Sequence, residues 1–254
     1  VSVDVDWIPM DLTQQWPSPP APEVGVTRAR VEYRLDGVQL ELDAIDCDDV
    51  PFERGDPVRS FPSWRLKRHY DGYHWMGVLG ASIGFESLTE RGCLIELDRT
   101  PGVIAVASQP MWIRWVTPDG LREHYPDYFV RLEDGQAVLM DVKPAAQIKD
   151  DVRKQFDMTA VFAAERGWRY VVYDAESKIR EANLRFLAPF RDSASTEELP
   201  KLPDDGLPLS DVAALLGVGS EGYARCYAHL WSGLLEVNLE QPLSIRTIVW
   251  ERRA

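Results

Sequence analysis

Two apolar runs joined by a tight turn constrain the fold of this chain more than any other feature. The turn is Glu133-Asp134-Gly135, and the runs beside it are rich in valine, leucine and aromatic residues, which is the pattern of a β-hairpin. The first run begins with Pro126-Asp127, and the second leads into Asp141-Val142-Lys143. A hairpin brings the start of its first strand beside the end of its second, so we expect Asp127 near Asp141 and Lys143. Because side chains alternate along a strand, Asp141 and Lys143 should share one face.

This combination of carboxylates and a lysine is typical of a site that cuts phosphodiester bonds with a metal ion. Carboxylate oxygens are hard ligands for Mg²⁺, which lowers the pKa of a bound water and polarises the phosphoryl oxygen. A lysine two residues after a ligand positions the attacking water or neutralises developing charge. Glu90, on a helix expected before the hairpin, can complete the acidic group. The alternative is that the aspartates are charges at strand edges and that Lys143 is a solvated surface residue.

The remaining pattern predicts the order of elements around this hairpin. Residues 26–50 alternate as two strands do, with Asp36-Gly37 as the turn between them. Further strands are expected at 103–107, 111–116, 125–132, 136–142 and 168–173, and helices at 85–98, 147–166 and 179–190. The order favours an α/β fold in which a mixed sheet is flanked by helices.

Changes in composition predict four parts of the chain. Residues 1–25 are rich in proline, which indicates a flexible N-terminal arm. Residues 26–192 form the catalytic domain, with the N-terminal hairpin at 26–50 and the core at about 59–190, and the polar, acidic residues 193–207 form a linker. In residues 208–254, helices are expected at 209–216 and 221–231 and strands at 234–239 and 244–250, which is the order of a winged-helix-like domain.

The formal net charge of −13 argues against a protein that coats nucleic acid by itself, because DNA affinity comes largely from Lys and Arg. It does not exclude a nuclease, since ligand carboxylates add negative charge and a partner can supply DNA affinity. Residues 59–75 interleave basic and aromatic side chains, which indicates either a DNA-contacting strip or a surface segment packed on the domain. The DNA-binding candidates are Arg59, Arg65, Lys67 and Arg68 in this strip, and Lys149, Arg153 and Lys154 on the helix after the hairpin.

Cysteine and histidine spacing excludes several other classes. The three cysteines (Cys47, Cys93 and Cys226) are far apart and odd in number, so neither a disulfide framework nor a metal knuckle is expected. The four histidines have no zinc-ligand spacing, and His124 is interpreted as a neighbouring strand residue. No apolar run reaches the length of a membrane span, and the residues at the start of the sequence predict no secretory signal. We therefore expect a cytoplasmic protein.

Four motifs occur together in an order that resembles the TnsA-like transposon endonucleases. They are Phe85–Arg91, Ser108–Pro110, Tyr125–Val130 and Asp141–Ala146. The resemblance covers about residues 55–190 well and the tail loosely. It implies a restriction-endonuclease-like core of the PD-(D/E)xK type in one subunit of a heteromeric transposase. Such a subunit cuts double-stranded DNA at the 5′ ends of the transposon, a DDE-type transposase subunit cuts the 3′ ends, and an AAA+ ATPase is the regulator. The protein would then be associated with the nucleoid when it is bound to DNA.

The resemblance also assigns roles to residues. It implies that Asp127 binds the metal, that Asp141 takes the second and chemically variable ligand position, and that Lys143 is the catalytic lysine. Glu86 and Glu90 compete for the helical carboxylate, and Glu90 fits the family spacing better. The expected cofactor is Mg²⁺, for which Mn²⁺ would substitute. Gln109-Pro110 also matches, and we interpret it as a turn beside a buried strand.

The tail and the overall role leave alternatives open. Tyr223, Arg225, Tyr227 and His229 share one predicted helix in an acidic context, so we favour contact with the ATPase partner over reading of DNA bases. A standalone restriction or DNA-repair nuclease of the same fold is the first alternative function. A catalytically inactive assembly subunit is the second, and the intact set of acidic residues with Lys143 argues against it.

Overall fold

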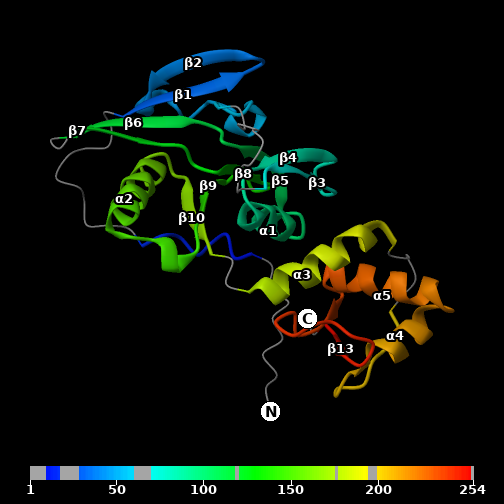
Figure 1. Ribbon diagram of the computed structural model, residues 1–254. Coiled ribbons are helices and arrows are strands. Elements are labelled where there is room, and N and C mark those ends of the chain that lie inside the picture. Colours follow the sequence, from blue (N-terminus) through cyan, green and yellow to red (C-terminus); the bar gives the residue numbers. More distant parts are fainter. Residues whose placement is uncertain are drawn as a thin grey trace. The chain divides into compact units, whose positions relative to one another are not determined.

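The computed structural model describes residues 10–17, 29–59, 70–117, 120–174, 177–193 and 199–252. The chain divides into two compact units (Figure 1). One is Asp11–Ala175 and the other contains Glu176–Ala254. Each is described separately below.

The N-terminal hairpin forms as predicted. Strands β1 (Arg30–Leu35) and β2 (Val38–Asp43) pair antiparallel across Asp36-Gly37. Both turn residues have positive φ angles, 52° and 76°, as a two-residue hairpin turn of this kind requires. Strand β1 also pairs with β6 (Trp112–Thr117), which pairs with β7 (Gly120–His124), so the sheet order is β2-β1-β6-β7. Strand β7 was not predicted, and the strand expected at 125–132 begins only at Tyr128.

A second sheet contains the hairpin on which the site prediction rests. Its order is β10 (Arg169–Tyr173), β9 (Ala137–Val142), β8 (Tyr128–Leu132) and β5 (Val103–Ser108). Strands β9 and β10 are parallel and the other pairs are antiparallel, so the predicted mixed sheet is confirmed. Helix α2 (Asp150–Ala164) makes the crossover between the parallel strands, since parallel neighbours need a long connection.

The segment before the second sheet differs from its prediction. A hairpin of β3 (Gly72–Met76) and β4 (Ala81–Phe85) precedes helix α1 (Leu88–Leu97), which starts three residues after the expected Phe85. The Ser87 hydroxyl caps the helix by accepting a hydrogen bond from the Glu90 N–H at 3.1 Å. Because this cap sets the first turn of α1, the chain before Ser87 is left extended and pairs as a strand.

One hydrophobic core lies between the two sheets and α2. It contains residues from β1, β6, β8, β9, β10 and α2, and Phe52 from the short 3₁₀ helix Phe52–Arg54. The Phe52 ring packs edge-on against Tyr33 and Trp168 and is tilted against Phe129, at centroid distances of 5.3–5.7 Å. Two further 3₁₀ turns, Ala44–Asp46 and Ala145–Gln147, belong to this unit.

Residues 11–17 correct part of the predicted flexible arm. The Trp16 indole donates to the Asp157 carboxylate at 2.7 Å, and its ring packs edge-on against Phe156 at 5.3 Å. The Trp16 N–H donates to the Tyr170 carbonyl at 2.9 Å. This part of the arm is thus packed against α2 and β10, because a large aromatic ring gains more from burial than the chain loses by ordering there. The other residues of the predicted arm, apart from Met10, lie outside the described part.

The C-terminal unit begins earlier than the predicted boundary at 192–193. It contains α3 (Lys178–Leu187), the 3₁₀ helix Ala188–Ser193, β11 (Leu207–Pro208), α4 (Leu209–Leu216), α5 (Ser220–Ser232), β12 (Leu235–Glu236) and β13 (Ile248–Glu251). Helix α3, predicted within the catalytic domain, belongs here because the buried Asn183 amide donates to the carbonyls of Leu239 and Gln241 at 2.7 and 2.8 Å. The strand order is β11-β13-β12. The winged-helix assignment stays a prediction.

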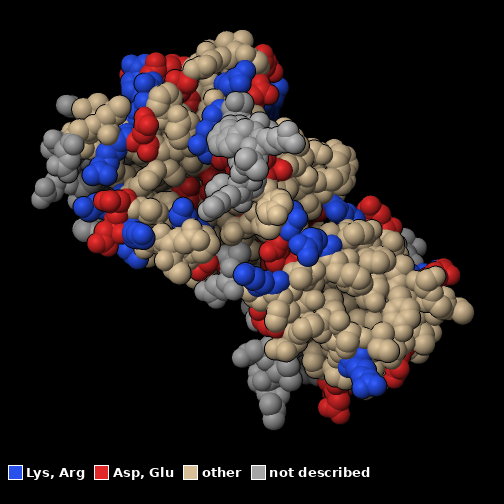
Figure 2. Space-filling model, in the orientation of Figure 1, with Lys and Arg blue, Asp and Glu red and all other residues tan. Residues whose placement is uncertain are grey.

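The face in Figure 2 shows how charge is distributed on each unit. On Asp11–Ala175, Lys and Arg side chains are interspersed with Asp and Glu, whereas a broad part of the C-terminal unit is uncharged. All three cysteines are buried and free. Among the described residues, no helix has both the length and the apolar character needed to cross a membrane.

Candidate active site

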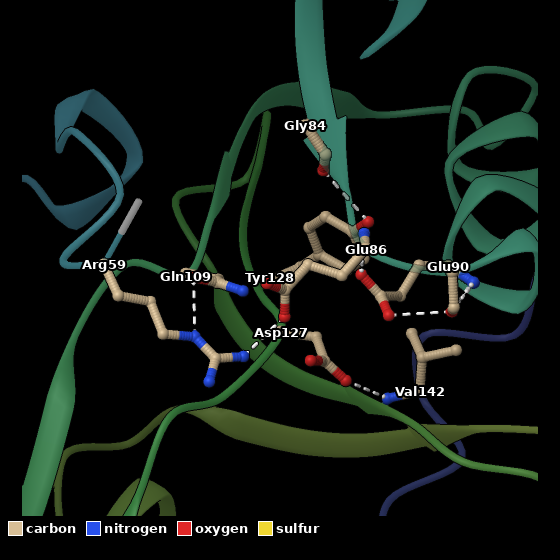
Figure 3. Close-up of polar contacts among 9 residues, drawn as sticks. Arg59, Gly84, Glu86, Glu90, Gln109, Asp127, Tyr128 and Val142 are labelled. Carbon is tan, nitrogen blue, oxygen red and sulfur yellow. Dashed lines mark hydrogen bonds and ion pairs between the residues drawn. The ribbon is translucent and has the colours of Figure 1, made fainter. Parts of the chain in front are cut away.

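The hairpin of β8 and β9 brings Asp127 to the end of β9. Asp127 immediately precedes β8, and its N–H donates to the Met140 carbonyl at 3.0 Å. Its Oδ2 accepts a hydrogen bond from the Val142 N–H at 2.7 Å (Figure 3). The Asp127 carboxylate therefore lies against the backbone between Asp141 and Lys143.

Asp141 is held by side chains from two other elements, and one of these side chains is itself contacted from a third element. It is buried on β9, and its Oδ2 accepts a hydrogen bond from the Tyr170 hydroxyl on β10. The His124 Nε2 on β7 lies 2.8 Å from the same oxygen, and the Gln155 amide on α2 contacts the other ring nitrogen of His124. The Oδ1 atom of Asp141 takes no hydrogen bond from the part of the chain that is described. One oxygen of Asp141 is thus fixed in place and the other is available.

The two candidate glutamates have different partners. Glu90 folds back on the start of α1, where its carboxylate accepts from the Ser87 hydroxyl and the Glu86 N–H, both at 2.7 Å. With the Ser87 cap, this resembles a capping box, in which a side chain three residues into the helix binds backbone before it. The Glu86 carboxylate instead pairs with the Arg59 guanidinium (Figure 3).

The electrostatics link Asp127 to both other candidate carboxylates. Burial raises the pKa of Asp127 well above its ordinary value, and the charges of Asp141 and Glu90 raise it further. Burial likewise raises the pKa of Glu90, although its hydrogen bonds from Glu86 and Ser87 oppose the shift. Acidic groups that raise one another's pKa create a region that favours a bound cation.

A metal ion bound in this region would have two carboxylates as its protein ligands, those of Asp127 and Asp141. Within the described parts of the chain, no three or more His, Cys, Asp or Glu side chains lie close enough together to hold a metal. The Glu90 carboxylate is engaged by its capping contacts with Ser87 and Glu86. Mg²⁺ retains several of its own waters and is commonly bound by one or two carboxylates, so Asp127 and Asp141 are a suitable donor set.

Lys143 follows directly after β9. Its N–H donates to the Tyr173 carbonyl at 2.9 Å, which continues the pairing of β9 with β10. The side chain is half-buried, and it forms no hydrogen bond or ion pair with the described residues. This ammonium group is therefore available to a ligand.

The DNA-binding candidates fall into three groups. Arg59 lies near the carboxylates, because its charge lowers the pKa of both Asp127 and Glu90. Arg65, Lys67 and Arg68 lie outside the described residues. Lys149, Arg153 and Lys154 are exposed at the start of α2 or just before it, and Arg153 also lies over the Trp16 ring at 5.5 Å.

The residues proposed for contacts in the tail are partly inaccessible. His229 is buried, and Tyr227 packs against Phe186 and Phe190 at centroid distances of 4.9 Å. Arg225 donates to the Leu216 carbonyl at 3.0 Å. These side chains serve the packing of α5 in its own unit.

Sequence reasoning missed several residues around the site. His124 was interpreted as a neighbouring strand residue and does lie on β7, but its contact with Asp141 was not predicted. Tyr170, which donates to Asp141, and Gln155, which contacts His124, come from separate elements and have no local motif in common. Gln109 was interpreted as a turn residue, and it does have a left-handed backbone with φ of 45°. Its side chain is nevertheless buried and accepts a hydrogen bond from Arg59 Nε at 3.0 Å. The position of Gln109 two residues after a predicted strand was the available signal.

The mixed α/β unit and the grouping of Asp127 with Asp141 and Glu90 are consistent with a nuclease-like domain. Residues 100–175 match the family described as TnsA-like endonuclease N terminal, and the match ends where the first compact unit ends. This segment is therefore similar to the N-terminal domain of TnsA-like endonucleases. The matched segment includes Asp127, Asp141 and Lys143 but not Glu90. No curated protein matches the chain.

Proposed function

We propose that this protein is a metal-dependent DNA endonuclease whose active site contains Glu90, Asp127, Asp141 and Lys143. The observation that carries the proposal is the placement of the Asp127 carboxylate at the end of β9, where Asp141 and Glu90 raise its pKa. This geometry lies largely within the segment that matches the TnsA-like endonuclease family. Hard carboxylate ligands for a metal ion are suited to hydrolysis of phosphodiester bonds, and a lysine after the second ligand can neutralise charge on the phosphate.

Each residue has a distinct part in the proposed reaction. Asp127 and Asp141 would hold Mg²⁺, or Mn²⁺ in its place, and the metal would supply a water of lowered pKa and polarise the phosphoryl oxygen. Tyr170 and His124 orient Asp141 through one oxygen, which would leave its second oxygen to bind the cation. Glu90 adds negative charge next to Asp127. Lys143 orients the attacking water and neutralises charge that develops on the phosphate.

The proposed biological setting is a heteromeric transposase. The protein would cut the 5′ ends of a transposon during excision, beside a DDE-type transposase subunit and under an AAA+ ATPase regulator. The family match supports this setting, as does the net charge of −13, which leaves DNA affinity to be supplied partly by partners. The restriction-endonuclease-like core and a winged-helix-like tail that contacts the ATPase are part of the same proposal.

The test is a cleavage assay on a duplex that contains the end of the element. The full chain is incubated with and without the partner proteins, in Mg²⁺, in Mn²⁺ and in EDTA. We expect 5′-strand cleavage at the transposon end with either metal and none in EDTA. Cleavage that persists in EDTA would refute metal dependence, and cleavage independent of the transposon end and the partners would favour a standalone nuclease. Failure to cleave in the complete mixture would favour the inactive assembly subunit.

Tyr170→Phe tests how Asp141 is held. The change removes the hydroxyl that donates to Asp141 and keeps the buried ring. We expect the Mg²⁺ concentration for half-maximal cleavage to rise about 10–100-fold, as is usual when an outer partner of a metal ligand is lost. Tyr33→Phe, at another buried tyrosine of the same unit, is the control. A lower rate at saturating Mg²⁺ with an unchanged Mg²⁺ requirement would contradict this role.

A further inference from the structure

Arg59 is fixed from three sides. Its Nε donates to the Gln109 side-chain carbonyl at 3.0 Å, and its terminal nitrogen pairs with Glu86 (Figure 3). The guanidinium lies over the Tyr125 ring at 5.1 Å. The Tyr125 ring in turn stacks on Trp112 at 5.4 Å, with planes only 9° apart. A side chain of this length is ordinarily mobile at the surface, so these contacts position a cation that is still 46% exposed.

Gln109 is the more unusual partner. Its backbone has a φ of 45°, in the left-handed region that a residue with a Cβ rarely adopts. Only 2% of its surface is exposed, yet the side-chain nitrogen has no hydrogen-bond partner among the described residues. In Figure 3 this nitrogen points away from Arg59, toward the side on which Asp127 lies. Strain and an unpaired buried donor at one residue indicate a role in binding a ligand.

We propose that Arg59 and Gln109 form a subsite for one DNA phosphate beside Asp127. The guanidinium presents several donors in one plane, which matches the oxygens of a phosphate, and the Gln109 amide nitrogen adds a neutral donor. Gln109 uses its carbonyl to hold Arg59 and its nitrogen to bind the ligand. This proposal rests on the proposed nuclease function, because the phosphate belongs to the DNA that the active site would cut.

In the protein without DNA, the Glu86 carboxylate is paired with Arg59. Its carboxylate is an anion with two oxygens, as the exposed part of a phosphodiester is, and it pairs with the terminal nitrogen of Arg59. A phosphate that approaches Arg59 must compete with Glu86 and with its negative charge. Removal of the Glu86 charge should therefore strengthen DNA binding, whereas removal of the Arg59 charge should weaken it.

The experiment measures binding of a fluorescent duplex to the full chain by anisotropy, in Ca²⁺ and over a range of KCl concentrations. Arg59→Gln should weaken binding about tenfold, the loss of one charge-assisted hydrogen bond. It should also reduce the slope of log affinity against log salt by about 1, as expected for one phosphate contact. Glu86→Gln should tighten binding, and Gln109→Ala should weaken it with little change in the salt slope, because the arginine charge remains.

Matched controls exist at the other end of β8. Arg131 pairs with Glu53 at 3.1 Å and lies over the Phe129 ring at 5.2 Å, so it repeats the surroundings of Arg59. Arg131→Gln removes the same charge as Arg59→Gln, and Glu53→Gln removes the same charge as Glu86→Gln, but both lie away from Asp127. Neither should change DNA binding. Equal losses in Arg59→Gln and Arg131→Gln would overturn the subsite. So would a Glu86→Gln variant that binds no more tightly than Glu53→Gln.

The outcomes separate this subsite from the nuclease function. Cleavage by the wild-type protein in Mg²⁺, together with unchanged binding by Arg59→Gln, would overturn the subsite alone. The expected binding changes without cleavage, even with partner proteins present, would overturn the nuclease function alone. Absence of measurable binding by the wild-type chain at the lowest salt concentration would overturn the subsite as a determinant of this protein's own DNA affinity.

Discussion

Asp127→Asn should eliminate cleavage while making the metal-free protein more stable. The variant loses a ligand charge, and we expect the rate to fall by at least about 10²–10³-fold, as it does when one group that stabilises transition-state charge is removed. Asparagine keeps an oxygen that can accept the Val142 N–H, so the local backbone pairing is retained. It does not carry the charge that burial, Asp141 and Glu90 disfavour.

The stability effect depends on pH in a defined direction. The pKa of Asp127 is raised in the folded protein, whereas an aspartate in an unfolded chain has a pKa of about 3.9. Protonated Asp127 therefore stabilises the folded protein. This contribution is fully present below the pKa of Asp127 in the unfolded chain, and it is lost as pH rises through the pKa of Asp127 in the folded protein. Wild type should lose this contribution toward neutral pH, and Asp127→Asn should not. In EDTA at neutral pH we expect Tm to rise by about 2–4 °C, which corresponds to about 1 kcal/mol in a domain of this size.

Thermal unfolding in EDTA between acidic and neutral pH measures this difference. Asp49→Asn, at an exposed turn position of the same unit, is the control for loss of one negative charge from an acidic protein. If Asp49→Asn raises Tm as much as Asp127→Asn does, the effect is one of net charge. If Asp127→Asn lowers Tm, the Asp127 carboxylate stabilises the folded protein, which contradicts the prediction.

Lys143→Met should remove cleavage without a change in stability or in the metal requirement. Methionine preserves the unbranched apolar stem and deletes the ammonium, which has no partner among the described residues. We expect the rate at saturating Mg²⁺ to fall by about 10²-fold or more, because the charge acts on the reacting phosphate rather than on the fold. The Mg²⁺ concentration for half-maximal activity should stay near the wild-type value.

Rates at saturating Mg²⁺, Mg²⁺ titrations and thermal unfolding together test the role of Lys143. Lys201→Met, an exposed lysine of the C-terminal unit, is the matched control. Near-wild-type cleavage by Lys143→Met would remove Lys143 from the reaction. A large loss of Tm would instead assign the ammonium a structural partner.

The hairpin and the placement of Asp127 were predictable because they depend on local interactions. A tight turn at Glu133-Asp134-Gly135 fixes the register of its two strands, and that register brings Asp127 to the end of β9. The hairpin at Asp36-Gly37 was predictable for the same reason. Helix α2 and strand β10 followed from apolar periodicity and came within a few residues of their expected bounds.

Other features could not be read from local pattern. Helix α1 begins after Ser87 because the Ser87 side chain caps it, and β4 therefore ends just before the helix. The apolar pattern alone also allows a helix that begins at Phe85. Helix α3 has the sequence of an ordinary amphipathic helix, and its membership in the C-terminal unit depends on the bonds of Asn183 to distant carbonyls. Residues 11–17 pack on α2 although their proline-rich surroundings indicated an arm.

The sequence by itself determined the elements of the central hairpin, the presence of Asp127, Asp141 and Lys143 at one end of it, and the acidic character of the protein. The tertiary structure alone decided that Tyr170 and His124 hold Asp141, that Glu90 caps α1, and that Gln109 and Glu86 position Arg59. The physical reason is separation along the chain. A turn fixes the relation of residues close in sequence, whereas contacts such as that of Arg59 with Gln109 form only when sheets and helices have packed around one core.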